Sequence, residues 1–302
     1  MRCIIALLLT AIPALAEVPT VVTDIPPVHA LVAQVMGDLG APELLLAKGA
    51  DEHDFQLRPS QASAVADAGL VVWVGPELTP WLEGALATRA EGAASLALLH
   101  AEGTRLQAYR AATPDPEDQG TDGGTDPGHG GEDPHAWLEP GNAQVWLGEI
   151  AAELGRLDPA NAATYQANAG AAAARITALD AELAAVLAPV RDKPLVTYHD
   201  AFGYFAEAYG LTLAGSVALG DASSPGASRL AGLRAKLEAG AVVCVFPEVQ
   251  NDPELMTQLA EGTGARIGGA LDPVGSSLEP GPEAYAALLS GLAQTIAECA
   301  AG

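Results

Sequence analysis

Short apolar runs alternate along the chain with amphipathic stretches of helical periodicity. The apolar runs, which we expect to form strands, lie at 20–24, 43–46, 70–75, 96–99, 195–198, 211–217, 242–246 and 266–271. The stretches that we expect to form helices lie at 28–36, 60–68, 79–87, 142–157, 201–209, 227–239, 253–261 and 283–300. Strands that alternate with helices are typical of βαβ units, which build mainly parallel sheets.

One alanine-rich stretch, residues 159–190, is longer than the other expected helices and divides the strands into two sets. Ala favours the helix more than any other residue, and about 30 helical residues extend for about 45 Å. We therefore predict a two-lobed α/β protein with mainly parallel sheets flanked by helices. Residues 17–158 and 191–302 would form the lobes, and 159–190 a long rigid helix that joins them.

The first residues are typical of a secretory signal peptide. A short positive start is followed by a mostly apolar segment, residues 3–16, which ends in the small-residue cleavage sequence Ala14-Leu15-Ala16. We expect residues 1–16 to be removed and the rest of the chain to be a soluble, exported protein. Two cysteines, Cys244 and Cys299, then remain, and in an oxidising compartment such a pair is a candidate disulfide.

Residues 112–134 are rich in Gly, Pro and acidic side chains and contain one histidine, His129. We expect this segment to be a flexible acidic loop, because its composition cannot bury a packed core. A loop of this length within a compact domain is either functional or disordered.

The charge of the chain excludes one class of partner. Of its 302 residues, 38 are Asp or Glu and 14 are Lys or Arg, which gives a formal net charge of −24. Such a surface repels phosphate backbones and anionic lipids, so nucleic acid is not an expected partner. The sequence also lacks the phosphate-binding loop and the strand-linked dinucleotide motif, which argues against a nucleotide enzyme.

Four polar residues follow apolar runs or the acidic loop, at positions where a ligand would be bound. They are His53, His135, His199 and Asp272. Ligands of open α/β sheets bind outside the carboxyl ends of the strands, and three imidazoles with one carboxylate suit Zn²⁺. Each position also has an ordinary explanation, since a single His is often solvated and Asp272-Pro273 is a common start of a turn.

Several motifs in order resemble the zinc-binding solute-binding proteins of bacterial ABC transporters, within the wider manganese- and zinc-binding group. The similarity lies in H-D-F-Q-L-R-P-S at 53–60, D-P-H-A-W-L-E-P at 133–140, Y-H-D-A-F-G-Y-F at 198–205, F-P-E-V-Q at 246–250 and L-D-P-V-G at 271–275. It extends from about residue 20 to the C-terminus. The resemblance implies two α/β lobes, a rigid linking helix and a metal site in the cleft between the lobes.

The resemblance also implies a set of metal ligands. His53, His135 and His199 would be the imidazole ligands and Asp272 the fourth ligand. A His at position 199 indicates zinc, because manganese members of the group usually carry Glu there and carboxylates suit manganese. Cys244 and Cys299 stand where zinc members have a disulfide.

The sequence departs from the family in ways that leave part of the site open. Glu52 directly precedes His53, so it is either an alternative fourth ligand or a partner of the ligands, and Glu248 is a further residue that approaches the cleft. The loop before the second His, which is often His-rich in the family, is acidic here, and His129 is at most a weak accessory ligand.

These features predict a periplasmic zinc-binding protein that is not an enzyme. Its expected partners are the membrane permease of an ABC transporter and, additionally, a zinc chaperone, and we expect it to be a monomer. Two alternatives remain at this point: a manganese or iron receptor of the same fold, and a secreted zinc hydrolase with three His ligands and a water.

Overall fold

The computed structural model describes residues 18–53, 55–109, 131–218 and 226–302. Within these residues lie two four-stranded parallel sheets. The first sheet consists of β1 (Val21–Thr23), β2 (Glu43–Leu44), β3 (Leu70–Trp73) and β4 (Ala94–Ala97). The second consists of β5 (Leu195–Thr197), β6 (Leu213–Ser216), β7 (Cys244–Phe246) and β8 (Arg266–Ile267).

The two sheets share one topology, as expected for two βαβ-based lobes. Their strand orders are β2-β1-β3-β4 and β6-β5-β7-β8, so the first strand of each set lies inside its sheet and the second forms an edge. The inner strands β1, β3, β5 and β7 are buried along their whole length, which accounts for their uninterrupted apolar sequences. The α/β architecture predicted from the sequence is confirmed.

The helices begin and end where the sequence carries the usual signals. Pro occupies the first turn of α1, α2, α3 and α4, where its missing N–H has no cost. Gly210, which has a φ of 67°, ends α6 in the left-handed conformation that glycine adopts readily. The helices are α1 (Pro26–Met36), α2 (Pro59–Asp67), α3 (Pro80–Leu86), α4 (Pro140–Leu157), α5 (Ala162–Leu187), α6 (Gly203–Tyr209), α7 (Ala227–Glu238), α8 (Glu254–Ala260) and α9 (Ala284–Ala301), with 3₁₀ turns η1 (Gly37–Leu39), η2 (Leu98–His100), η3 (Ala136–Leu138) and η4 (Ala188–Val190).

The observed strands differ at their ends from the expected ones, and in two cases the physical reason is identifiable. The apolar run 96–99 is divided between β4 and the 3₁₀ turn η2, where Leu98 and Leu99 are apolar because they enter the core. The run 266–271 is a strand only at its first two residues. Gly268 follows with the Phe246 ring against it, and Leu271 forms an isolated bridge with Glu248.

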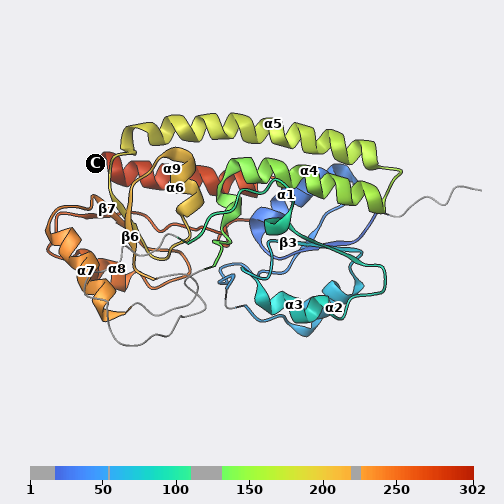
Figure 1. Cartoon of the computed structure of the whole chain (residues 1–302), viewed down its shortest axis with the longest axis horizontal. Coiled ribbons are helices and arrows are strands. Elements are labelled where there is room, and N and C mark those ends of the chain that lie inside the picture. Colours follow the sequence, from blue (N-terminus) through green and yellow to red (C-terminus); the bar gives the residue numbers. More distant parts are fainter. Residues whose placement is uncertain (1–17, 54, 110–130, 219–225) are drawn as a thin grey trace, which may run out of the picture.

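The long helix α5 is packed along its length and is not a free connector. It lies along the top of both halves of the molecule, where it runs beside α4 at one end and α9 at the other (Figure 1). Its buried side chains, which include Tyr165, Ile176 and Leu187, join a single apolar core. That core contains residues of both sheets, from Val21 in β1 to Phe246 in β7.

A disulfide joins Cys244 in β7 to Cys299 in α9, as the sequence predicted. It ties the inner strand of the second sheet to the last helix, across 55 residues of chain.

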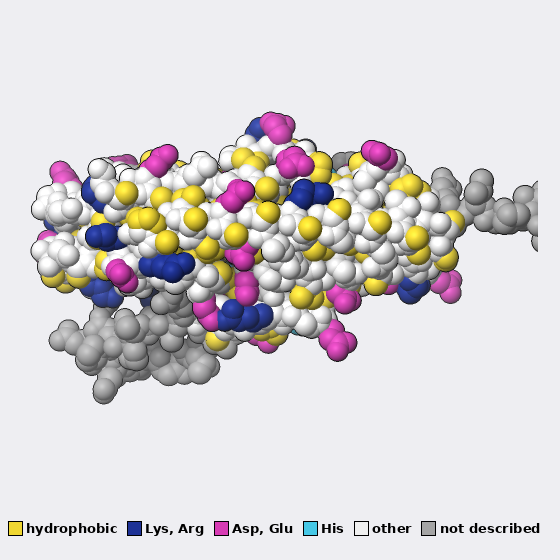
Figure 2. Space-filling view, turned by 90° about the horizontal axis from the view of Figure 1, so that it is seen from above, with side chains coloured by type: hydrophobic (Ala, Val, Ile, Leu, Met, Phe, Trp, Pro, Cys, Tyr) yellow, Lys and Arg dark blue, Asp and Glu magenta, His cyan; other side chains and the backbone are white. Residues whose placement is uncertain are grey.

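Figure 2 shows the face that α5 covers. Hydrophobic side chains are spread over it, and acidic and basic side chains are scattered among them without a continuous patch of one sign. None of the helices described has the length and apolar character needed to cross a membrane. The expected signal peptide, residues 1–16, lies outside the described residues, as do His129 and most of the expected acidic loop.

Candidate metal centre

Three histidines and one glutamate from distant parts of the chain meet at one point. Ligand atoms of Glu52, His53, His135 and His199 all lie within 4.8 Å of one another. His53 is in the loop after β2, His135 directly precedes η3, and His199 follows β5. The structure thus brings together the three histidines from both halves of the molecule, and two of them, His53 and His199, lie on segments that follow parallel strands.

The three imidazoles face a common centre. Nε2 of His135 and Nε2 of His199 are 3.4 Å apart, and the His53 ring lies 5.3 Å from the His135 ring and 5.9 Å from the His199 ring. Glu52 Oε1 is 3.7 Å from His53 Nε2. Two nitrogen atoms at 3.4 Å can both bind an ion about 2.0 Å from each of them.

Asp133 fixes the orientation of His135. Its Oδ1 accepts hydrogen bonds from the main-chain N–H of His135 at 3.0 Å and from Nδ1 at 2.7 Å. Asp133 is itself buried and held at its main chain, where its N–H donates to Gln107 O and its carbonyl accepts from Tyr204 Oη. With Nδ1 protonated and engaged, Nε2 presents its lone pair toward the centre.

Glu248 does the same for His199. Its Oε2 lies 2.6 Å from His199 Nδ1, and its Oε1 accepts from the main-chain N–H of His199 at 3.2 Å. Glu248 is 2% exposed and follows β7, next to the strand that carries His199. The sequence predicted Glu248 near the cleft, and in the structure Glu248 contacts His199. The sequence did not identify Asp133 as the partner of His135.

A local signal in the sequence would have found Asp133. An Asp two residues before a His accepts a hydrogen bond from the main-chain N–H of that His in an Asx turn. Asp133 does this for His135, and Asp51 does it for His53, with Oδ1 at 2.8 Å from the N–H. The same D-x-H pattern therefore shapes the backbone at two of the three histidines.

Burial keeps the charge of this cluster low. It lowers the pKa of His53 well below its ordinary value, and the neighbouring His135 and His199 lower it further. His53 is therefore neutral at pH 7. Burial likewise raises the pKa of the Glu52 carboxyl to about 7, against the effect of His199. Neutral imidazoles are the form that binds a metal ion.

Asp272 lies outside this group of ligand atoms, and its carboxylate is used elsewhere. Oδ2 accepts hydrogen bonds from the main chain of Ser277 at 2.9 Å and from its hydroxyl at 2.6 Å. Oδ1 accepts from the main chain of Ser276 at 3.0 Å and from Gln250 Nε2 at 3.3 Å. This is the turn-forming role that an Asp-Pro sequence favours.

The turn that Asp272 holds nevertheless contacts the loop of Glu52 and His53. Ser276 O accepts a hydrogen bond from Gly49 N at 2.9 Å. On its other side, Glu52 O accepts from Trp81 Nε1 at 2.8 Å. Asp272 therefore influences the cluster only indirectly, through the position of the Gly49–His53 loop.

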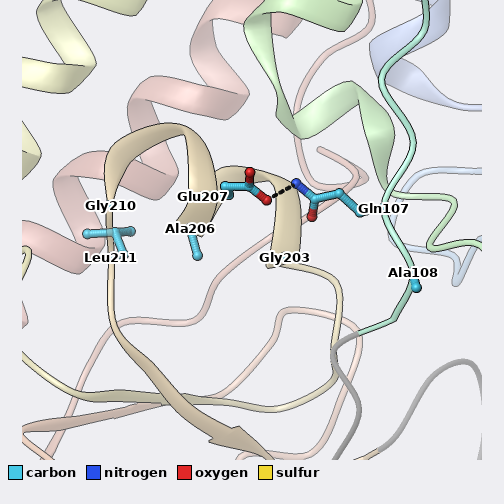
Figure 3. Close-up of a pocket in the computed structure, with 7 residues that line it drawn as sticks. All are labelled: Gln107, Ala108, Gly203, Ala206, Glu207, Gly210 and Leu211. Carbon is cyan, nitrogen blue, oxygen red and sulfur yellow. Dashed lines mark hydrogen bonds between the residues drawn. The ribbon is translucent and has the colours of Figure 1, made fainter.

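An open hollow of about 650 Å³ lies elsewhere, between the segment at Gln107 and helix α6 (Figure 3). Glu207 is the charged residue that lines it, and its carboxylate accepts a hydrogen bond from Gln107 Nε2 at 2.6 Å and pairs with Arg105. The hollow therefore offers no group of ligand atoms and is distinct from the metal centre. Its lining residues are Gln107, Ala108, Gly203, Ala206, Glu207, Gly210 and Leu211.

Comparisons with known proteins identify the family of this chain. Residues 21–299 match the ZnuA family, described as "Zinc-uptake complex component A periplasmic". The chain is 48% identical over 306 residues to the high-affinity zinc uptake system protein ZnuA of Paracoccus denitrificans, covering 96% of this chain and 94% of that protein. It is 35% identical to the protein of the same name from Brucella abortus, over 92% of this chain and 91% of that one. A crystal structure of a ZnuA deletion mutant with zinc bound superposes with a TM-score of 0.76, at 25% identity, over 93% of this chain and 98% of that one. The chain belongs to the ZnuA family of periplasmic components of zinc-uptake complexes.

Proposed function

We propose that this protein binds Zn²⁺ with high affinity in the periplasm and delivers it to the membrane permease of an ABC transporter. The observation that carries the proposal is the buried cluster of three imidazoles, two of them oriented by buried carboxylates. Imidazole nitrogen with one carboxylate is a ligand set that suits zinc. The zinc uptake named for the Paracoccus and Brucella relatives supports the same function.

The proposed ligands are His53, His135, His199 and Glu52. We place Glu52 fourth because its carboxylate lies within the cluster, whereas that of Asp272 binds Ser276 and Ser277. Asp133 and Glu248 hold the imidazoles in place. Four protein ligands complete a tetrahedral zinc site and leave no open position for a catalytic water, so the proposed role is binding without catalysis.

The remaining parts of the proposal concern processing and partners. Residues 1–16 would direct export and be removed, and residues 17–158 and 191–302 would form the two lobes on either side of the helix 159–190. The protein would act as a monomer, and it would receive zinc as the free ion or from a zinc chaperone.

The test is the metal content of the protein purified without chelator, together with competition against a zinc chelator of known affinity. We expect one tightly bound equivalent of zinc, which His199→Ala loses. His29→Gln is the matched control, because His29 is also buried but lies in α1, outside the cluster. Tight zinc binding that survives His199→Ala, or tighter binding of manganese than of zinc, would contradict the proposal.

A further inference from the structure

A second group of metal-ligating side chains lies outside the buried centre. Glu77, His100 and Glu132 each offer one ligand atom, and these atoms all lie within 4.8 Å of one another. The nearest pair, His100 Nε2 and Glu77 Oε1, is 3.0 Å apart. The three residues are far apart in sequence, so the fold brings them together.

Each of these residues is held by a different part of the first half of the molecule. Glu77 follows β3, and His100 ends the 3₁₀ turn after β4, so both lie at the carboxyl ends of adjacent parallel strands. Glu132 lies on a segment that pairs with Ala108 in an antiparallel bridge and is flanked by the hydrogen bond from Asp133 N to Gln107 O. The backbone therefore fixes all three positions.

The charges in this group are poorly balanced by protein alone. Two carboxylates share a single imidazole, in a chain whose net charge is −24. Glu77 Oε2 is inaccessible to solvent and makes no hydrogen bond to any described residue. The Glu77 side chain is 28% exposed as a whole, so the cost of this unpaired oxygen is moderate, and a cation between the carboxylates would give it a partner.

We propose that Glu77, His100 and Glu132 form a second, weaker site for a divalent transition-metal ion such as Zn²⁺. One imidazole and two carboxylates suit zinc better than Mg²⁺ or Ca²⁺, which take oxygen ligands. The site binds more weakly than the buried centre because it has one imidazole in place of three and the His100 side chain is 49% exposed. Water completes the coordination on the exposed side.

The second site lies next in sequence to a residue that supports the buried centre. Glu132 precedes Asp133, whose carboxylate orients the imidazole of His135. An ion that links Glu132 to Glu77 and His100 holds the segment that carries Asp133. The exposed site is thus placed to collect zinc from solution beside the segment that shapes the buried centre.

The experiment titrates Zn²⁺ into the purified protein after one equivalent has filled the buried centre. Isothermal titration calorimetry follows the heat of the second event, and NMR follows the imidazole ring signals of His100. We expect a second equivalent to bind and to shift those signals. His100→Ala should abolish this event, and Glu77→Gln or Glu132→Gln should weaken it at least about 10-fold, the lower end of the cost of disturbing a metal's surroundings.

Glu182→Gln is the matched control, since Glu182 is an exposed carboxylate of α5 outside either group. All four variants should keep the first, tight equivalent, so failure of this proposal is distinguishable from failure of the buried site. A second event that survives His100→Ala, or His100 signals that zinc does not move, would show that His100 and Glu77 only form a hydrogen bond with each other. Either result overturns the proposal.

Discussion

A single carboxylate oxygen, Oδ1 of Asp133, accepts both the main-chain N–H and the Nδ1–H of His135. One atom thereby sets the position of the His135 backbone and the rotation of its ring together. The pair is fully buried, at 1% and 0% exposure, so bulk water does not reach these hydrogen bonds in the folded protein.

Asp133→Ala should therefore weaken zinc binding by about 10- to 100-fold, as loss of the residue that orients a metal-binding His commonly does. Affinity is measured by competition with a chelator. Asp192→Ala, at an exposed aspartate, should leave affinity unchanged. Unaltered affinity in a folded Asp133→Ala protein would show that packing alone orients His135.

Asp272→Asn should leave one equivalent of bound zinc with the same number of nitrogen and oxygen ligands. Its effect should be on stability, because the variant replaces an acceptor of the Ser277 N–H and hydroxyl. We expect a loss of about 0.5–1.5 kcal/mol in the free energy of unfolding, the net contribution of a typical hydrogen bond, because Ser277 is exposed and water can satisfy its N–H and hydroxyl. X-ray absorption spectroscopy of the zinc-bound protein checks the coordination, and loss of an oxygen ligand would identify Asp272 as the fourth ligand.

Zinc affinity should fall as the pH drops below about 7. Burial raises the pKa of Glu52 to about 7 in the metal-free protein, so below that pH a proton must leave the carboxyl when zinc binds. This exchange lowers the apparent affinity by up to about tenfold per pH unit. His53 does not contribute in this range, because its pKa is lowered and its ring is already neutral.

Glu52→Gln should remove that pH dependence between pH 6 and 7 and should lower the affinity at pH 8. The measurement is chelator competition at each pH. An equally steep fall in the Glu52→Gln variant would mean that another group takes up the proton and that Glu52 is not a ligand.

Replacement of both Cys244 and Cys299 by Ala should lower the free energy of unfolding by about 4 kcal/mol, since the bridge closes 55 residues of chain. Denaturant unfolding measures this loss. Zinc stoichiometry should stay at one, because the bridge lies between β7 and α9 and contributes no ligand. Unchanged stability of the variant would show that the conformational freedom of the unfolded chain is already limited without the disulfide.

The sequence located the three histidines because each follows an apolar run or a recognisable motif, and the ends of parallel strands converge. It could not choose between Glu52 and Asp272, since both are carboxylates beside such positions. Their difference lies in side-chain direction: Asp272 turns toward the N–H groups of Ser276 and Ser277, while Glu52 enters the cluster. Side-chain direction depends on tertiary contacts that periodicity does not encode.

The packing of α5 was also only partly predictable. Its length and alanine content predicted a helix. The alanines form no strong apolar stripe, so the sequence did not indicate which elements α5 would contact. The structure shows that residues such as Tyr165 and Leu187 bury α5 against helices of both halves. Helix propensity is local, whereas the packing partners include side chains as far apart in sequence as Arg175 and Gln34, which are 141 positions apart.

The continuous core has a consequence for how the protein releases its cargo. Trp137 of the first half donates to Pro273 O of the second, and its own carbonyl accepts from Tyr285 Oη in α9. Rotating the halves apart would expose at least one of these aromatics, at about 4 kcal/mol for roughly 150 Å² of apolar surface. A widely open molecule is then on the order of one in 10³ at equilibrium. We therefore expect zinc to leave through small movements of short loops, such as the one between Gly49 and His53, without wide separation of the two halves.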